Sequence, residues 1–381
     1  MKRLAIISTH PIQYNAPFFK ELSLQPELSV KVFYTWSQAS GKVYDPGFNI
    51  VREWDIPLLD GYEYEFIKNI ALKPGSGHFW GIVNPSLIKK VREWRPDFIL
   101  VYGWAFFSHM KLMRRFYKEI PILFRGDSTI LDQGQGVKGW LKKKLLTWIY
   151  SSVDICLYVG KNNYDYFRKY GVADERLKYL PHVVDNKRFR HAGNGSEDPA
   201  MDVLRKQLEH KIGFLFVGKF ERKKNPLLLV QAFRQLNDDN MALLFVGQGD
   251  LEKDVKDSST GINGIHFLSF QNQKAITTIY HLADVLVLPS AYNETWGLVV
   301  NEAMAAGLAI IVSDKVGCAP DLVEDGINGY IFSSGNSQSL IDKMKVMTGQ
   351  DLKQMKEASL NKIDHFSIER NVLTLTKILC K

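Results

Sequence analysis

Short apolar runs alternate with amphipathic helical stretches along most of this chain, and this alternation constrains the fold more than any other feature. In the first half the runs are LAIIS (4–8), VKVFY (30–34), DFILVY (97–102), PILF (121–124) and DICLYV (154–159). Because consecutive residues are apolar, both faces of each expected strand must be buried. Such strands, separated by helices, are typical of a parallel sheet between two helix layers. The first half is therefore predicted to be a doubly wound α/β domain.

A second series of the same kind predicts a second domain of the same class. Its runs are IGFLFVG (212–218), MALLFVG (241–247), GIHFLSF (264–270), ADVLVLP (283–289) and LAIIVSD (308–314). A length of 381 residues also favours two domains, because a single core usually stops growing below that size. We therefore expect two Rossmann-like domains that bind ligands at the carboxyl ends of their strands.

The expected domain boundaries follow the composition. A polar stretch with Gly and Pro after Asp185 is typical of an interdomain linker. The prediction is an N-terminal domain over 1–185, a linker over 186–210 and a second domain over 211–364. Residues 365–381 have helical periodicity and are expected to form a helix that folds back towards the first domain.

The excess positive charge lies entirely in the first half. Residues 1–185 hold 26 Lys and Arg against 18 Asp and Glu, whereas residues 186–381 hold 23 of each. Part of the excess lies in GWLKKKLLTWIY (139–150), which predicts a basic amphipathic helix. Two interpretations stay open: peripheral contact with an anionic membrane, or a solvated helix face over an ordinary core. Nucleic acid is not an expected partner, because no zinc spacing, helix-turn-helix pattern or aromatic-rich ribonucleoprotein strand accompanies the charge.

Cysteine usage and hydropathy indicate a compartment. Cys156, Cys318 and Cys380 are odd in number, scattered and free of metal-ligand spacing, which favours reduced thiols. The apolar run at the start of the chain is too short for a signal peptide. The longest uncharged apolar run, AMAAGLAIIV (303–312), is about half of what crosses a bilayer. We therefore expect a cytoplasmic protein, with the inner face of the plasma membrane as the place of any membrane contact.

Two loops after expected strands of the second domain have features of anion binding. VGKFERKKNP (217–226) places Lys219 and Lys224 before Asn225-Pro226, a natural helix start. Ammonium groups beside helix amides can bind an anion, although a solvated lysine cluster is the alternative interpretation. VGQGD (246–250) holds only part of a dinucleotide fingerprint, and a tight strand-to-helix turn explains it adequately.

The segment PSAYNETWGLVVNEAMAAG (289–307) places two glutamates around an expected helix start. If the helix begins near Trp296, Glu294 precedes it and Glu302 lies about two turns in, roughly 12 Å away. The first turn between them has unpaired backbone amides. Carboxylates bind hydroxyl pairs and helix amides bind phosphate, so this order suits a nucleotide sugar. The alternative is that both carboxylates are solvated at a helix edge.

This segment, with GKFERKKNP before it and LVEDGINGYIF after it, resembles the retaining glycosyltransferases of family 4. The resemblance implies the GT-B fold, in which two Rossmann-like domains face each other across a cleft. It also implies that 1–185 is the acceptor-side domain and that 211–364 is the nucleotide-sugar-binding domain. The likeness covers nearly the whole second domain and extends to PHVVDNKRF (181–189), which is similar to the hinge stretch of that family. The resemblance implies that Glu294, the first residue of an E-x7-E signature, contacts the donor sugar and that Glu302 binds the ribose.

The resemblance also assigns the groups that hold the diphosphate. Lys219 and Lys224 match a basic pair five residues apart, although the family more often has Arg where this chain has Lys219. The amides implied to hold the sugar and phosphate are those of Thr295, Trp296, Gly297 and Leu298.

The first domain departs from the family pattern in two places. Many relatives have a glycine-rich loop after the first strand, whereas this chain has STHPIQYNAP, whose His10, Gln13 and Tyr14 become acceptor or cleft candidates. After PILF the family often has a histidine near the reacting carbon, whereas this chain has Asp127 there, close to Arg125. Asp127 is a candidate to bind a sugar hydroxyl or to stabilise positive charge at the anomeric carbon. A turn-forming role after Gly126 is the alternative.

The resemblance implies a retaining, metal-independent transfer of a hexose-type sugar from a nucleoside-diphosphate sugar to a hydroxyl of a glycan or lipid-linked acceptor. Glu294, Asp127 and Lys224 are then the catalytic candidates, and cell-envelope polysaccharide or lipopolysaccharide synthesis is the expected setting. No cofactor and no metal are expected, and no Asp-x-Asp occurs in the chain. Two alternatives stay open: a non-hydrolysing nucleotide-sugar epimerase and a non-catalytic nucleotide-sugar-binding protein.

Overall fold

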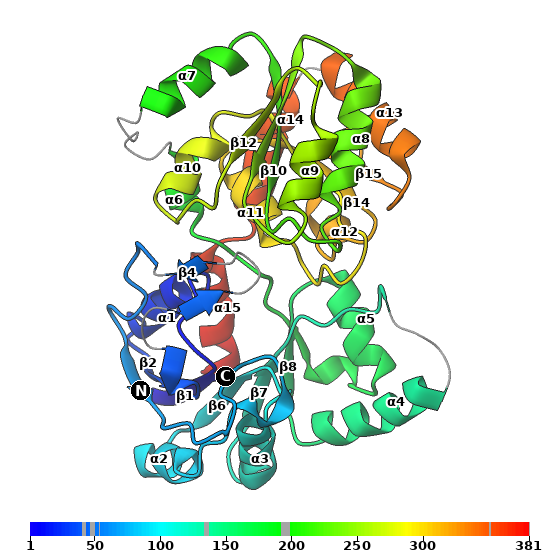
Figure 1. Ribbon diagram of the computed structural model, residues 1–381. Coiled ribbons are helices and arrows are strands. Elements are labelled where there is room, and N and C mark those ends of the chain that lie inside the picture. The colour runs from blue at the N-terminus through cyan, green and yellow to red at the C-terminus, as the bar shows by residue number, and fades with distance from the viewer. Residues whose placement is uncertain are drawn as a thin grey trace. The chain divides into compact units, whose positions relative to one another are not determined.

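The computed structural model describes the main chain of residues 1–39, 43–45, 50–52, 54–132, 137–191, 199–349 and 352–380. The chain forms two compact α/β units, each with its own sheet (Figure 1). The first unit consists of Met1–Val43, Pro57–His182 and Ile368–Lys381, and the second of Tyr44–Ile56 and Val183–Ser367. The predicted fold class, two domains with doubly wound parallel sheets, is confirmed.

The sheet of the first unit has seven strands among the described residues, in the order β5-β2-β1-β6-β7-β8-β9. All of the neighbouring strands in it pair in parallel. The strands are β1 (Lys2–Ser8), β2 (Leu28–Tyr34), β5 (Glu63–Phe66), β6 (Phe98–Tyr102), β7 (Ile122–Arg125), β8 (Ile155–Tyr158) and β9 (Leu177–Tyr179). The helices are α1 (Ala16–Ser23), α2 (Leu87–Trp94), α3 (Phe107–Phe116), α4 (Val137–Tyr150), α5 (Lys161–Lys169) and α15 (Ile368–Leu379), with short 3-10 turns at Ser37–Ala39, Phe79–Gly81 and Asp174–Arg176.

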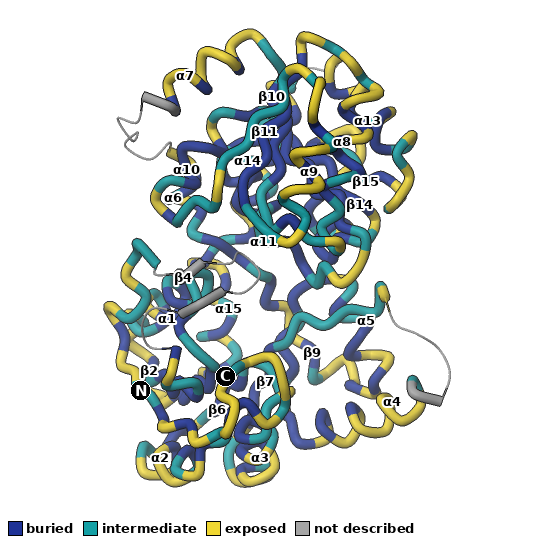
Figure 2. The backbone as a smooth tube through the Cα atoms, in the orientation of Figure 1, coloured by how far each residue is buried: buried dark blue, intermediate teal, exposed yellow. Residues whose placement is uncertain are grey.

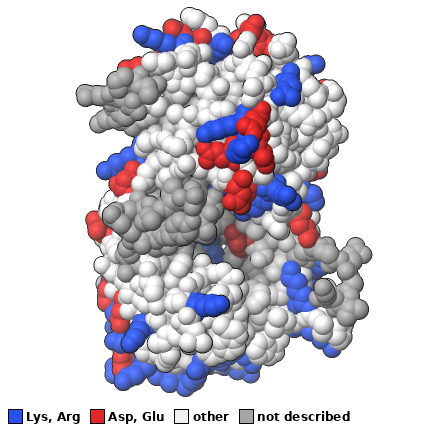
Figure 3. Space-filling model, viewed as in Figure 1, with Lys and Arg blue, Asp and Glu red and all other residues white. Residues whose placement is uncertain are grey.

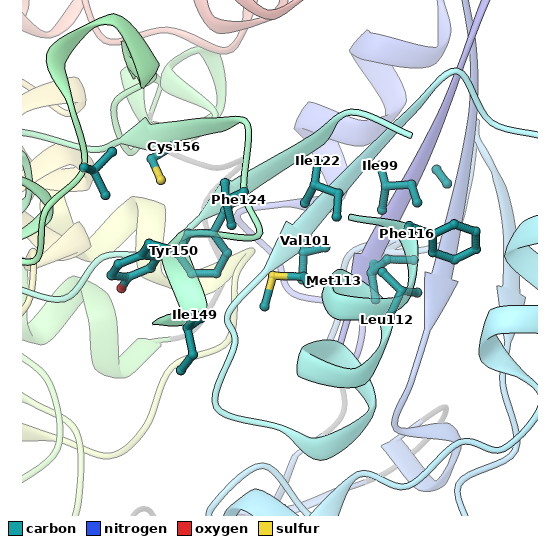
Figure 4. Close-up of a cluster of buried hydrophobic side chains, with 14 of the residues drawn as sticks. Ile99, Val101, Leu112, Met113, Phe116, Ile122, Phe124, Ile149, Tyr150 and Cys156 are labelled. Atoms are coloured by element: carbon teal, nitrogen blue, oxygen red, sulfur yellow. The ribbon is translucent and has the colours of Figure 1, made fainter. Parts of the chain in front are cut away.

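The core of this unit lies between the sheet and its helices. Figure 4 shows Ile99 and Val101 of β6 and Phe124 of β7 among side chains from the helices α3 and α4. All of these side chains are almost completely buried. Burial at consecutive strand positions, as over Leu4–Ser8, is what the apolar runs predicted for a sheet covered on both faces.

The sheet of the second unit has six strands in the described ranges, in the order β12-β11-β10-β13-β14-β15, again all parallel. Its interior strands are dark blue in Figure 2, because almost every residue in them is buried. The strands are β10 (Ile212–Val217), β11 (Met241–Val246), β12 (Ile265–Leu268), β13 (Val285–Leu288), β14 (Ala309–Ser313) and β15 (Gly329–Phe332). Two further strands, β3 (Val43–Asp45) and β4 (Ile50–Arg52), pair with each other.

Nine helices of the second unit fall in the described ranges. They are α6 (Asn186–Arg190), α7 (Pro199–Leu208), α8 (Pro226–Leu236), α9 (Glu252–Ser258), α10 (Ala275–Tyr280), α11 (Leu298–Ala305), α12 (Ala319–Leu322), α13 (Ser337–Gly349) and α14 (Leu352–Ile363). Helix α8 begins at Pro226 after Asn225, as the sequence predicted.

The structure corrects the prediction of a linker over 186–210. Its described residues form helices α6 and α7, and they belong to the second unit. The side-chain amide of Asn186 donates to the carbonyls of Ile363 and Phe366, both at 3.1 Å, and Phe189 is completely buried. The polar composition misled the prediction because Asn186 and Arg188, among the described residues of this stretch, use their polar groups in hydrogen bonds within the second unit.

The C-terminal helix α15 belongs to the first unit and packs against α1. The side-chain amide of Asn371 on this helix donates to the carbonyl of Pro181 at 2.8 Å. Asn371 is itself almost completely buried. The last helix of the chain therefore helps to fix the segment at which the first unit ends and the second begins.

His109 on α3 is a buried ionisable group of the first unit. Its Nδ1 lies 2.9 Å from the carbonyl oxygen of Gly103, and its Nε2 lies 2.8 Å from the hydroxyl oxygen of Thr35. Burial lowers the pKa of His109 from 6.5 to about 4, although hydrogen bonds to the main chain at Gly103 and Tyr102 oppose this shift. The folded ring is therefore neutral, with Nδ1 donating to the carbonyl and Nε2 accepting from the hydroxyl.

We predict that the free energy of unfolding of the first unit falls as the pH decreases from 6.5 towards about 4. The unfolded state takes up a proton on His109 in this range while the folded ring does not, which amounts to roughly 3 kcal/mol at the acid end. Urea unfolding across this range should show a smaller pH slope in His109→Gln than in the wild type. The exposed His78→Gln variant is the control, and parallel slopes for the wild type and His109→Gln would contradict the assignment.

Candidate active site

The candidate donor site lies at the carboxyl ends of β10 and β13. The chain runs from β10 to β11 on one side, and β13 pairs with β10 on the other, with Phe214 opposite Val285. The strand order therefore reverses between these two strands, and the loops that follow them start side by side. In open parallel sheets this is the position at which ligands bind.

The loop after β10 is fastened to the loop after β11 by main-chain hydrogen bonds. The amide of Gly218 donates to Val246 at 3.0 Å, and the amide of Phe220 donates to Gln248 at 2.9 Å. A side chain at Gly247 would place its Cβ 2.0 Å from the carbonyl oxygen of Gly218, so only glycine permits this approach. The VGQGD motif thus has a structural explanation: it holds the lysine-bearing loop in place.

Lys224 and Glu294, which the sequence placed in one site, contact each other. The ammonium group of Lys224 donates to Glu294 Oε2, and the two side chains are only 13% and 12% exposed. The hydroxyl of Ser290 donates to the same carboxylate oxygen at 3.0 Å. The two loops are also joined through the amide of Ala291, which donates to the carbonyl of Lys223 at 2.7 Å. The geometry therefore brings a cation and a carboxylate together from separate loops.

The loop from Glu294 to Gly297 is fixed by a second set of main-chain contacts. The amide of Gly317 donates to the carbonyl of Glu294 at 2.9 Å, and the amide of Cys318 donates to that of Trp296 at 3.0 Å. Gly297 caps α11 with a φ of 97°, in the left-handed region that favours glycine. The start of α11 is thus held directly beside Glu294, where its first-turn amides and its dipole attract anions.

Trp296 is placed inward. Its side chain is buried, and its Nε1 donates to Asn301 Oδ1 at 2.8 Å. The expected contribution of Trp296 to the site is therefore limited to its main chain. Leu298 is the first residue of α11, one or two residues later than the start predicted near Trp296-Gly297.

Glu302 lies in the second turn of α11 but is only 3% exposed, in contrast to a carboxylate at an open end of the site. Its Oε2 accepts a hydrogen bond from the hydroxyl of Tyr280 at 2.6 Å. Tyr280 is the last residue of α10, is completely buried and packs edge-to-face against Phe189 of α6. One oxygen of Glu302 is thus held by a neutral hydroxyl from a neighbouring helix.

The rest of the basic cluster contains more internal pairing than its sequence suggested. Lys223 forms an ion pair with Glu221 at 3.4 Å. Lys219 is half-buried, and its carbonyl accepts a hydrogen bond from the amide of Glu221 at 3.0 Å. Arg222 is exposed. Within this basic cluster, the described contact with Glu294 is made by Lys224.

The first unit holds the remaining candidates. Asp127 follows β7, with its side chain about half exposed, and its Oδ2 lies 3.9 Å from His182 Nε2. Burial and the nearby Arg125 guanidinium lower the pKa of His182 to about 3, while Asp127 opposes this shift. His182 is therefore neutral at ordinary pH, and its contact with Asp127 is that of an uncharged ring.

The structure corrects the prediction that Arg125 is an acceptor or cleft residue. Its side chain is buried, and its guanidinium donates to the carbonyls of Leu180 at 2.5 Å and Pro181 at 3.0 Å. Burial lowers the pKa of Arg125, although Tyr102 and Asp127 oppose this shift. Its donors are used to hold the segment before His182, so its role is to position that segment.

His10, Gln13 and Tyr14 lie in the loop between β1 and α1, and all three are partly exposed. The Nδ1 of His10 lies 2.9 Å from the hydroxyl of Thr9, and its ring packs edge-to-face on Trp36. These residues follow the strand that, with β6, marks the reversal of strand order in the first sheet. Their position is thus that of a ligand site in an α/β unit.

Three residues around these groups were missed by the sequence analysis: Ser290, Tyr280 and His182. Ser290 lies four positions before Glu294, and its spacing could have suggested a contact. Tyr280 and His182 reach their partners through the tertiary fold, and nothing in their local sequence indicates this. Among the described residues, no group of three or more His, Cys, Asp or Glu side chains is placed to hold a metal ion.

We predict that Gly317→Ala disrupts the donor loop. A Cβ at this position would lie 1.9 Å from the carbonyl oxygen of Thr295 and 3.0 Å from that of Glu294, so the loop before α11 must move. Urea unfolding should show a loss of about 2 kcal/mol or more. Gly349→Ala, where a Cβ meets nothing within 4 Å, is the control and should change stability by less than about 0.5 kcal/mol. An equally small effect of Gly317→Ala would show that the loop is not held as described.

Comparison with known proteins supports this reading of the second unit. A family model described as glycosyl transferases group 1 matches residues 201–361. Spore coat protein SA of Bacillus subtilis is 30% identical over 289 residues, which cover 72% of this chain and 69% of that protein. The lipopolysaccharide 1,2-N-acetylglucosaminetransferase of Salmonella typhimurium is 35% identical over 144 residues, which cover 34% of this chain and 38% of that protein.

Among solved structures, that of HepE from Anabaena in complex with UDP is similar over 100% of both chains, with a TM-score of 0.71 and 16% identity. This likeness shows that the two sheets and their helices form the GT-B fold. The family model covers the loops that carry Lys219, Lys224, Glu294 and Glu302, and the relative from Bacillus extends the match over most of the chain. The chain therefore belongs to the group 1 glycosyl transferases.

Proposed function

We propose that this chain is a retaining glycosyltransferase that moves a hexose-type sugar from a nucleoside-diphosphate sugar to a hydroxyl of a glycan or lipid-linked acceptor. One observation carries the proposal. Lys224, Glu294 and the start of α11 converge at the reversal of strand order in the second unit. A cation, helix amides and a carboxylate are the groups that a diphosphate joined to a sugar requires.

In this proposal the diphosphate binds to Lys224, Lys219 and the amides of residues 295 to 298. Lys224 and Glu294 are paired with each other in the structure. A phosphate oxygen can then take over as partner of the ammonium group, which frees carboxylate oxygens of Glu294 for the sugar hydroxyls. Since both side chains are mostly buried, their interactions with a donor are stronger than those of solvated charges.

The proposed reaction forms a bond between the acceptor oxygen and the anomeric carbon while the bond from that carbon to the phosphate oxygen breaks. Lys224 and the α11 amides stabilise the charge that develops on the leaving diphosphate. The leaving phosphate oxygen accepts the proton of the acceptor hydroxyl, which attacks from the same face and so retains the configuration. Asp127, half-exposed beside His182, is proposed to stabilise positive charge at the anomeric carbon.

The proposed setting is the synthesis of envelope polysaccharide or lipopolysaccharide at the cytoplasmic face of the membrane. The name of the Salmonella relative supports this setting, although the match spans only 38% of that protein. We propose uracil as the base of the donor nucleotide, because HepE was solved with UDP. The family membership supports a nucleotide-sugar donor in general.

An assay with purified protein, a panel of nucleotide sugars and membrane extract tests the function. We expect sugar transfer that requires the extract as a source of acceptor. A change of configuration in the nucleotide sugar without any acceptor would instead show an epimerase. Binding without turnover across the panel would show a non-catalytic protein.

We predict that Lys224→Ala lowers the transfer rate by about 10²-fold or more, because the charge that develops on the leaving diphosphate loses its ammonium partner. Initial rates at saturating donor measure this effect. Lys223→Ala is the matched control, since its side chain is 38% exposed and forms an ion pair with Glu221. A circular dichroism melt establishes that both variants fold. Near-normal turnover by folded Lys224→Ala would refute the assigned role.

We predict that Glu302→Gln weakens UDP binding by about tenfold, because a charged acceptor for the ribose hydroxyls is lost. Calorimetric titration with UDP and with 2′,3′-dideoxy-UDP measures the effect. The variant and the wild type should bind the dideoxy compound almost equally, since that ligand has no hydroxyls to lose. Equal weakening for both ligands would show that Glu302 acts only on the protein, through its bond to Tyr280.

A further inference from the structure

Helix α4 has two apolar faces, and the first unit covers only one of them. Leu146, Ile149 and Tyr150 are buried, and Figure 4 shows the last two beside core side chains of the sheet. The exposed face, which we call the α4 outer face, carries Trp140, Leu141, Leu145 and Trp148, with exposed fractions of 55%, 56%, 47% and 45%. Single exposed apolar residues are ordinary, but a contiguous set that includes two tryptophans marks an interaction surface.

Helical geometry groups three of these side chains closely. At 100° per residue, Leu141, Leu145 and Trp148 fall within about 60° of one another around the helix axis. Trp140 and Trp148 are about 12 Å apart along the axis. Figure 2 shows most of α4 as exposed, in contrast to the buried strands of the same unit. Trp140 lies about 80° from Trp148 around the axis, so the α4 outer face is an apolar stripe of Leu141, Leu145 and Trp148 with a second indole beside it.

Cations lie beside this face. Lys142, Lys143 and Lys144 are all exposed, and the ammonium group of Lys144 lies 3.8 Å from the centre of the Trp140 ring. The guanidinium carbon of Arg114 lies 4.6 Å from the Trp148 ring. The sequence has no Asp or Glu between residues 132 and 154. Figure 3 shows further Lys and Arg gathered over α2 and α3 of the same unit.

A shallow pocket of about 580 Å³ opens on this face. It is lined by Trp140, Lys143, Lys144, Thr147, Trp148 and Ser151. Its walls are thus two indoles, and its polar groups are ammonium groups and hydroxyls. This combination suits a phosphodiester headgroup with the first carbons of its chains, because the phosphate contacts the ammonium groups and the carbons contact the rings.

We propose that the α4 outer face docks on a lipid bilayer that contains anionic lipids, with the helix axis parallel to the membrane plane. Indoles prefer the headgroup level, where the ring is in an apolar environment and the N–H remains hydrated. Lysines are depleted in the centre of protein interfaces but are favoured beside lipid phosphates, so Lys143 and Lys144, which line the pocket, favour lipid over protein.

The sequence left open whether this helix contacts a membrane or is a solvated face over a core. The structure shows a core face and, separately, a cationic apolar face, so the core does not use all of the apolar residues. In the part of the chain that the structure describes, no helix is long and apolar enough to cross a bilayer. The proposed docking therefore places α4 at the surface of the bilayer and does not depend on the proposed reaction.

Flotation of the full-length protein with phosphatidylcholine vesicles, with and without phosphatidylglycerol, tests the proposal. We expect binding that requires phosphatidylglycerol and weakens as the salt concentration rises. Lys143→Gln/Lys144→Gln and, separately, Leu141→Gln/Leu145→Gln should each lower the partition coefficient by about tenfold or more. The matched control is Leu24→Gln/Leu373→Gln, which removes two leucines, 63% and 55% exposed, elsewhere on the same unit.

Three outcomes would overturn the proposal. The first is that the wild type does not float with either vesicle. The second is that the α4 variants float as well as the Leu24→Gln/Leu373→Gln control. The third is that sedimentation velocity shows self-association abolished by Leu141→Gln/Leu145→Gln while vesicle binding is absent, which would assign the face to a second copy of the chain. UDP binding, measured in parallel, should be the same in all variants, since none of them alters the second unit.

Discussion

The parallel pairing of β10 with β13 is the constraint on which the candidate donor site depends. Two residues of each strand are paired, and this register brings together the loops that carry Lys224 and Glu294, although 70 positions separate these residues in sequence. Main-chain hydrogen bonds to the loops after β11 and β14 then fix both segments. The side chains of Lys224 and Glu294 can remain mostly buried because these main-chain hydrogen bonds hold their loops in positions where the two charges are paired.

The sequence predicted the interior strands of both sheets, because burial on both faces leaves a local pattern, but it missed the edge strands β5, β9 and β15, which are only partly buried. The runs at 4–8 and 241–247 needed no tertiary information, and the helix after Gly297 was placed within one or two residues. The predicted linker failed because polar composition does not distinguish a solvated connection from short helices whose polar groups are bonded, as Asn186 is. Composition gives the number of polar residues in a stretch but does not show which of them are hydrogen-bonded within the fold.

The site was predictable to the extent that its groups lie on one segment. Glu294 and Glu302 were found through their spacing, whereas the hydroxyl of Tyr280 on Glu302 and the ring of His182 near Asp127 depend on contacts made across the fold. Arg125 shows the opposite error. A cation near an expected reaction centre suggested a ligand contact, but carbonyls at Leu180 and Pro181 take its donors. Whether a charged residue faces ligand or protein cannot be read from its neighbours in sequence.

The position of α15 has a consequence for biosynthesis. A ribosome produces this helix only after the whole second unit, yet the helix packs on α1 and supplies Asn371 to the carbonyl of Pro181. During translation the second unit thus has all of its residues before the first unit does, which reverses the usual order in which N-terminal domains mature earliest. Until α15 emerges, the apolar surface of α1 that it covers is exposed in the nascent chain, where it can associate with other incompletely folded chains.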